Sequence, residues 1–313
     1  MLTRWIFILI TATAFSMAAR AADLNRELMD AAVIGDLERA ESLLVNGASP
    51  NAAGKFGKSA LMFAVEEGNE DTVRLLLGRG ANVNARSVAG CTALTYAAEN
   101  GQSGLIDLLI DSGAKTYPKT RAGWDALAMA TRQGYIDALA ALIRHGANVN
   151  TSDKDGTTAL MAAAERNDAQ ALRMLLSADA DVHVRNKDGA SALTLAACKG
   201  HDAIIDILHQ AGDNPDAQDN DGSTALHCAA ENGHVDTIRL LIAKGANIHH
   251  QNLEGKSALI AAAESGQLDS ARNLLTLGAN PSLKDKKGHT AKDHARQNRF
   301  RDIVRLMEGA GAH

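Results

Sequence analysis

Apolar and polar positions repeat with a period of 33 residues along most of this chain. A glycine stands at every 33rd position. A polar residue and an alanine stand two and three positions after it, a leucine follows in seven of the eight repeats, and a further alanine stands seven positions after the glycine. These ladder glycines are Gly57, Gly90, Gly123, Gly156, Gly189, Gly222, Gly255 and Gly288. Self-similarity with this period is typical of arrays in which each supersecondary unit packs against its neighbours.

Each unit is expected to contain two helices. The residue two positions after each ladder glycine is Ser, Thr or Asp, which accepts hydrogen bonds at a helix start, so a short helix begins there. A second glycine column, from Gly35 to Gly266, ends that helix. A longer helix follows, with a leucine core column that begins at Leu43 and closes with Met307. We therefore predict an all-α solenoid of about nine stacked helix-turn-helix units with projecting hairpin turns.

The clearest family resemblance lies in residues 222–234, which read GSTALHCAAENGH. This run resembles the ankyrin repeat, with alanine where the family often has proline, and the resemblance covers about residues 24–309. It implies L-shaped repeats whose hairpin tips and short inner helices line a concave, protein-binding face. The repeats are placed near 24–54, 55–87, 88–120, 121–153, 154–186, 187–219, 220–252, 253–285 and 286–313.

The first 21 residues form a different kind of segment. Arg4 precedes an apolar run that is short for a bilayer span, and Ala19-Arg20-Ala21 has the small-x-small form of a signal-peptidase site. We predict a signal peptide at 1–21, of a bacterial Sec type, and an ankyrin-repeat domain at 22–313 that is periplasmic or secreted. A retained membrane anchor is the alternative reading; after cleavage we expect no stable anchor.

Composition and charge exclude several kinds of function. The formal net charge is −5 with mixed signs, which argues against nucleic-acid binding through a basic stripe. No motif of a nucleophile elbow or a phosphate-binding loop is present. His249-His250 has no further ligands at useful spacing, and His227 and His234 occupy positions typical of the ankyrin family. We expect no catalytic residue, no cofactor and no metal.

Three cysteines are an odd count for an exported protein. Cys91 lies about three repeats from Cys198 and Cys228, too far for a disulfide. Cys198 and Cys228 occupy different positions in adjacent repeats, which disfavours a bridge between them. Cys198 is then expected to be a partly covered, inert thiol or, if it faces solvent, a redox-sensitive one.

The aromatic residues are unevenly distributed. Six of the seven that follow the predicted leader lie between residues 56 and 135. Phe56 and Trp124 fall in predicted hairpin turns, while Phe63 and Tyr96 take the same inner-helix position in consecutive repeats. Exposed aromatic side chains are preferred interface anchors, so repeats two to four are predicted to hold the main contact surface, although Phe63 and Tyr96 could instead pack between repeats. Tyr135 is included in this predicted site.

A column of mostly acidic residues follows nine positions after the ladder glycines. Five of its first seven members are glutamates, including Glu66 and Glu99, and Arg132 is an exception. On the concave face they would form an acidic ridge suited to a basic partner. We favour the alternative that these residues keep the face soluble, and retain Glu66, Glu99 and Arg132 as candidate partner-binding residues.

Repeat five departs from the glycine columns twice. Asn167 replaces the glycine of the interhelical loop, and Asp179 replaces the glycine after the second helix. Both residue types tolerate left-handed backbone better than most, so we predict local strain of up to about 1 kcal/mol.

The functional prediction is a monomeric, non-catalytic scaffold that binds another protein through its concave face and hairpin tips. One alternative is an accessory factor that protects or stabilises a periplasmic enzyme. Another is a secreted effector that acts on host proteins. A hydrolase is disfavoured because no nucleophile–base pair is evident.

Overall fold

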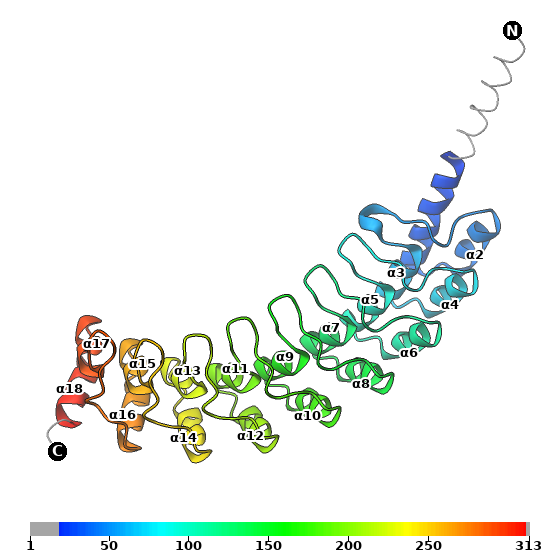
Figure 1. Ribbon diagram of the computed structural model, residues 1–313. Helices are drawn as coiled ribbons and strands as arrows, with labels where there is room; N and C mark the ends of the chain where they lie inside the picture. Colours follow the sequence, from blue (N-terminus) through cyan, green and yellow to red (C-terminus); the bar gives the residue numbers. More distant parts are fainter. Residues whose placement is uncertain (1–18, 311–313) are drawn as a thin grey trace, which may run out of the picture. The chain divides into compact units, whose positions relative to one another are not determined.

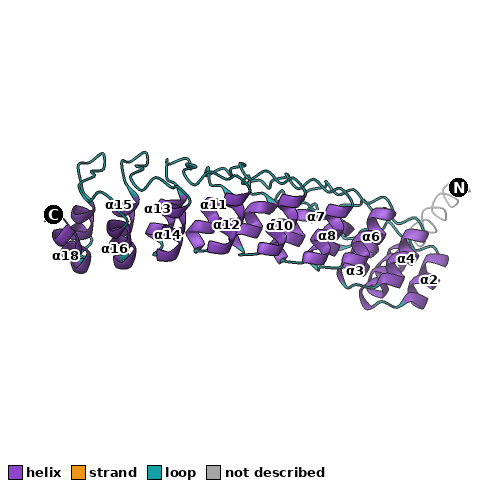
Figure 2. Cartoon of the chain, turned by 90° about the horizontal axis from the view of Figure 1, so that it is seen from below, coloured by secondary structure: helices purple, strands orange, loops and turns teal. Residues whose placement is uncertain are grey.

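The computed structural model describes residues 19–310, so the predicted signal peptide at 1–21 falls almost wholly outside the described residues. The chain divides into two compact units, with the boundary between Asn148 and Val149. Within residues 19–310 all regular structure is helical, and Figure 2 shows helices joined by loops without strands. The prediction of an all-helical fold is therefore confirmed.

The first unit is built from pairs of antiparallel helices. Short inner helices α3, α5 and α7 lie side by side, and each packs against the longer outer helix that follows it in sequence (Figure 1). A helix over residues 19–34 precedes them. The remaining elements are α2 (Leu37–Val45), η1 (Lys55–Gly57), α3 (Ala60–Glu66), α4 (Glu70–Gly78), α5 (Ala93–Glu99), α6 (Ser103–Asp111), α7 (Ala126–Gln133) and α8 (Ile136–Arg144).

The second unit repeats the same arrangement. Its inner helices, α9 to α17 in odd numbers, pack in one row, and its outer helices, α10 to α18 in even numbers, pack in a second row (Figure 1). The elements are α9 (Ala159–Glu165), α10 (Ala169–Ser177), α11 (Ala192–Lys199), α12 (Asp202–Gln210), α13 (Ala225–Glu231), α14 (Val235–Ala243), α15 (Ala258–Glu264), α16 (Leu268–Thr276), α17 (Ala291–Gln297) and α18 (Arg301–Ala310).

The polar residues two positions after the ladder glycines are the N-caps of the inner helices, as predicted. Ser59 is the N-cap of α3 and its side chain accepts a hydrogen bond from the Met62 amide. Asp125 caps α7 through the Ala128 amide in the same way. These bonds satisfy amides that have no partner within the helix, so the helix start is fixed by sequence.

Small residues allow the inner helices to stack. The alanine seven positions after each ladder glycine, from Ala64 to Ala295, has no exposed surface in any of the eight repeats. The leucine column of the outer helices is buried too, with Leu76 and Leu109 wholly enclosed. Alanine carries no side chain beyond Cβ, so neighbouring inner helices approach closely, and leucine fills the wider space between the two rows.

Four residues other than glycine adopt left-handed backbone among the described residues. Asn167 has φ of 58° and Asp179 has φ of 63°, as their replacement of column glycines predicts. Arg299, with φ of 67°, takes the equivalent loop position in the last repeat. Phe56, with φ of 64°, lies at a hairpin tip, directly before a ladder glycine. The residue at this position has no positive φ in the other repeats. A bulky side chain in this region is uncommon and costs free energy.

The hairpin tips are tied to one another by backbone hydrogen bonds. In the first unit the Val88 amide donates to the Phe56 carbonyl over 2.7 Å. In the second unit the Asn220 amide donates to the Asp188 carbonyl over 3.0 Å. Within each unit such bonds hold neighbouring tips together, so the loops beside the inner helices of that unit are ordered.

Candidate partner-binding surface

Lys58 connects two of the predicted aromatic anchors in the first unit. Its Nζ lies 4.8 Å from the ring centre of Phe63 and 4.4 Å from that of Tyr96. The same ammonium forms an ion pair with the Glu66 carboxylate. Lys58 follows a ladder glycine, and the other three residues come from the inner-helix columns of two consecutive repeats. The tertiary structure thus joins Phe63, Glu66 and Tyr96 into one cluster around a lysine that sequence reasoning missed.

The cluster is partly shielded from water. Phe63 and Tyr96 are half-buried, and the Lys58 side chain is only 15% exposed. Burial raises the pKa of the Tyr96 hydroxyl, and the nearby Lys58 charge offsets part of that increase. Cation–π contacts strengthen when water is excluded, so the three side chains hold one another in place.

Trp124 and Arg132 form a second aromatic–cation pair. The Arg132 guanidinium lies 4.1 Å from the centre of the Trp124 ring, which connects a hairpin turn to the end of α7. Trp124 is half-buried, and its role as a partner-binding anchor stays a prediction. The contact with Arg132 shows that the Trp124 side chain lies against α7, the helix that follows the turn.

Phe56 is the most exposed of the predicted anchors. Its side chain is 66% exposed, and Lys55 Nζ lies 5.0 Å from the ring centre. The residue also has left-handed backbone, an uncommon combination for an aromatic residue at the surface. Strained positions of this kind cluster at binding sites, so Phe56 keeps its place among the candidate residues.

Two predicted residues are not joined to these clusters. Tyr135 is 42% exposed but lies over the loop glycine of the preceding repeat: a Cβ on Gly101 would stand 2.7 Å from its ring. This places Tyr135 at the interhelical loops, where it covers Gly101. Glu99 is half-buried near the end of α5, and among the described residues no ion pair to it is found.

Two glutamates of the acidic column form ion pairs with lysines, one in each unit. In the first unit Glu66 is neutralised by Lys58. In the second unit Lys256 Nζ lies 2.7 Å from Glu264 and 3.0 Å from Glu254. These ion pairs, together with nearby Glu231 and His227, line a small pocket of about 130 Å³.

His201, His227 and His234 have structural roles. His201 and His234 bond through Nε2 to the carbonyls of Glu165 and Cys198 in the preceding repeats, both at 3.1 Å. His227 is buried between Thr224 and the Lys256 carbonyl, and burial lowers its pKa to about 4. It therefore stays neutral at physiological pH.

Cys198 and Cys228 form a disulfide, which corrects the expectation of two unlinked thiols. Their Cα atoms are 4.9 Å apart, on the neighbouring helices α11 and α13. The two positions lie nine and six residues after their ladder glycines, one helical turn apart, and the offset between adjacent inner helices brings them together. Both residues are half-buried, and Cys91 is the free cysteine among the described residues.

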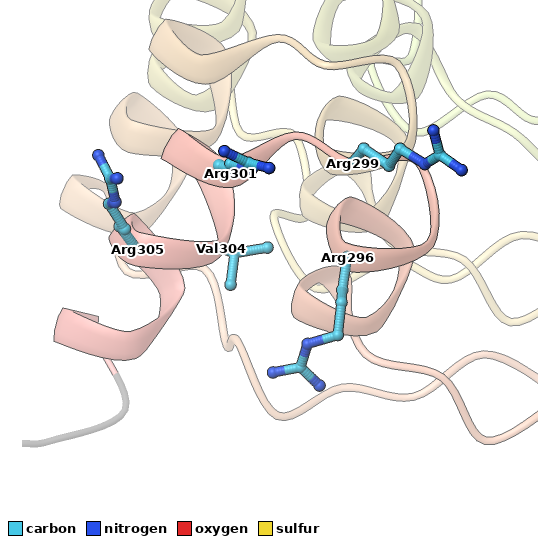
Figure 3. Close-up of a pocket in the computed structure, with 5 residues that line it drawn as sticks. All are labelled: Arg296, Arg299, Arg301, Val304 and Arg305. Carbon is cyan, nitrogen blue, oxygen red and sulfur yellow. The ribbon is translucent and has the colours of Figure 1, made fainter.

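Arginines gather at the end of the second unit. Arg296, Arg299, Arg301 and Arg305 line a shallow depression of about 500 Å³ beside Val304. Figure 3 shows that the guanidinium groups of Arg296, Arg299 and Arg305 point in different directions. The group gives this surface positive charge without converging on one anion.

One group of side chains in the described residues could hold a metal ion. Asp285, His289 and His294 place their ligand atoms within 4.8 Å of one another. The expectation of no metal site rested on His249-His250, which have no further ligands at useful spacing, and did not take this group into account.

None of the helices within residues 19–310 is both long and apolar enough to cross a membrane.

Comparison with known families accounts for most of the chain. A model of three ankyrin repeats matches residues 28–120, 112–186 and 178–252, and a single ankyrin-repeat model matches residues 254–286. Curated proteins show no significant match to the chain. Ankyrin repeats generally act as protein–protein interaction modules and are typically non-catalytic scaffolds. With the helix pairs, capped inner helices and hairpin tips described above, these matches show that the chain belongs to the ankyrin-repeat family.

Proposed function

We propose that this protein is a non-catalytic scaffold that binds a partner protein through the inner helices and hairpin tips of its first unit. The observation that carries the proposal is the Lys58 cluster, in which Phe63 and Tyr96 flank one cation on the surface of α3 and α5. Exposed Phe56 stands at a tip beside it in sequence. Aromatic side chains with few rotatable bonds are effective interface anchors.

The surface is suited to binding because it is already ordered. The rings of Phe63 and Tyr96 are held by Lys58, that of Trp124 is held by Arg132, and the Phe56 carbonyl is bonded to the next tip. Side chains that are fixed before association lose little conformational freedom on binding, which favours affinity. The mixed charges suit a partner with apolar groups beside both acidic and basic residues.

We further propose that the protein is exported to the periplasm or secreted as a monomer, after removal of residues 1–21. The leader-like sequence of these residues is one support. The Cys198–Cys228 disulfide is a second, because disulfides persist in oxidising compartments and are rare in the reducing cytosol. N-terminal sequencing of the protein from fractionated cells tests this; an intact leader on a cytosolic protein would contradict it.

Partner capture from the native compartment tests the function. The mature chain is immobilised, and captured proteins are compared with those held by Phe56→Ala, Lys58→Met and Trp124→Ala variants. Leu253→Ala is the matched control, since Leu253 is also an exposed apolar residue at a hairpin, in the second unit.

We expect the wild type and the control to capture the same proteins, and the three variants to lose them. Equal capture by all variants would overturn the placement of the site. Measurement of the identified partner's activity and half-life with and without this protein then distinguishes an accessory role toward an enzyme, in which they change, from simple tethering.

A further inference from the structure

The last repeat contains a compact group of metal-ligating side chains. Asp285 lies in the hairpin turn, His289 follows the ladder glycine Gly288, and His294 lies on α17. Their ligand atoms are all within 4.8 Å of one another. Asp285 and His294 are buried, at 6% and 7% exposure, while His289 is half-exposed and leaves a path for an ion from solvent.

Stacking of the repeats does not require the two histidines. At the position of His289 the other repeats have Lys58, Cys91, Trp124, Thr157, Ala190, Ser223 and Lys256. At the position of His294 they have Phe63, Tyr96, Met129, Ala162, Leu195, Cys228 and Ala261. These positions vary freely in size and polarity, so an imidazole at both of them, in one repeat, calls for a separate explanation.

Asp285 has one oxygen engaged in the turn and one directed at the histidine. Its Oδ1 accepts hydrogen bonds from the amides of Lys287 and His289, at 2.9 and 2.8 Å. Its Oδ2 lies 2.8 Å from Nε2 of His294. The backbone amides fix the carboxylate, so Oδ2 is held in place as a donor atom beside an imidazole nitrogen.

A second carboxylate stands behind His294. Glu264, at the end of α15, has Oε1 3.6 Å from Nδ1 of His294, on the opposite side of the ring from Asp285. Histidines that bind metals usually donate their other ring N–H to a carboxylate or carbonyl, which fixes the ring and strengthens the ligand. Glu264 is close enough to take this role after a small side-chain movement.

We propose that Asp285, His289 and His294 form a binding site for a divalent transition metal of the zinc class. The donors are Oδ2 of Asp285, Nε2 of His294 and a ring nitrogen of His289, a two-nitrogen, one-oxygen set that suits tetrahedral Zn²⁺. Ligand atoms around tetrahedral zinc are about 3.3 Å apart, so the half-exposed His289 ring turns inward on binding. The proton on Nε2 moves to Nδ1, where Glu264 accepts its hydrogen bond. The fourth position is open to water or to a donor from a partner.

Zinc titration of the chelator-stripped, full-length mature protein tests the proposal. Isothermal titration calorimetry is expected to show one Zn²⁺ per chain, and Co²⁺ is expected to give the visible absorption of a tetrahedral site. His289→Gln removes one ligand at a half-exposed position. Loss of a residue that only hydrogen-bonds a metal ligand typically weakens metal binding at least about 10-fold, so loss of a ligand should weaken zinc binding by more than this. His249→Gln is the matched control at an exposed histidine, and it should bind zinc as the wild type does.

The outcomes separate the site from a structural role. His294→Gln is expected to abolish binding, and His289→Gln provides an independent result if that buried substitution unfolds the repeat. Circular dichroism and thermal unfolding without zinc should be unchanged in His289→Gln. An absence of saturable binding in the wild type would overturn the proposal, as would equal affinity in His289→Gln or a loss of binding in His249→Gln.

Discussion

Cys198 on α11 is covalently linked to Cys228 on α13, with 4.9 Å between their Cα atoms. The bond closes a loop across a sequence separation of 30 residues and fastens two neighbouring inner helices. Linking two repeats restricts the unfolded chain, and it makes local separation of these repeats less favourable than elsewhere in the second unit.

Reduction should therefore destabilise the second unit. We expect dithiothreitol, or the Cys198→Ala/Cys228→Ala double substitution, to lower the free energy of unfolding by about 2–4 kcal/mol, the usual range for a native disulfide. Urea unfolding with and without reductant measures the difference. Cys91→Ala should remain sensitive to reductant and the double variant should not; three reactive thiols in unreduced native protein would contradict the bond.

Asp213 should make stability depend on pH. It replaces the alanine that elsewhere follows the helix-stop glycine, and burial raises its pKa to about 6. Below the unfolded-state pKa near 3.8 the carboxyl is protonated in both states and carries no penalty. Between pH 3.8 and 6 the unfolded state has lost this proton while the folded state keeps it, so stability falls across this window by up to about 3 kcal/mol and stays level above it.

Asp213→Ala should consequently stabilise the protein at pH 8 by about 1–3 kcal/mol and have little effect at pH 4. Urea unfolding across this pH range measures the effect. Asp188→Ala, at an exposed carboxylate, is the control and should show no such dependence. A stabilisation that is equal at both pH values would point to side-chain size, and not charge, as the cause.

Lys58 should control the ionisation of Tyr96. Burial raises the pKa of Tyr96, and the Lys58 ammonium counteracts this increase. In Lys58→Met the pKa of Tyr96 is expected to rise further, and stability to fall by about 1 kcal/mol as both cation–π contacts are lost. A pH titration of the tyrosine ring NMR signals measures the shift, with exposed Tyr117 as an internal reference. An unchanged Tyr96 titration would show that the two groups are not in contact.

Replacing either left-handed residue of repeat five with glycine should stabilise the protein. Asn167→Gly and Asp179→Gly are each expected to raise stability by a few tenths to about 1 kcal/mol, because glycine adopts positive φ without a steric penalty. The reverse change Gly134→Asn, at the same loop position with φ of 80°, should lower it by a similar amount. Thermal unfolding compares the three; a clear loss of stability in Asn167→Gly would contradict the strain.

The sequence by itself determined the repeating unit, the start of each inner helix and most of the core. Caps, tight turns and small-residue columns act within a few residues of one another, so the 33-residue period was enough to place them. The exposure of Phe56 and the left-handed backbone of Asn167 and Asp179 also followed from local chemistry.

Only the tertiary structure decided which side chains of adjacent repeats meet. Lys58 against Tyr96, the Cys198–Cys228 bond and Glu264 behind His294 each join residues of adjacent repeats. Their partners lie 30 or more residues apart in sequence, at different positions of the repeat. The offset between packed helices sets these pairings, and it arises from the fit of side chains between helices, which a column-by-column alignment of the sequence does not contain.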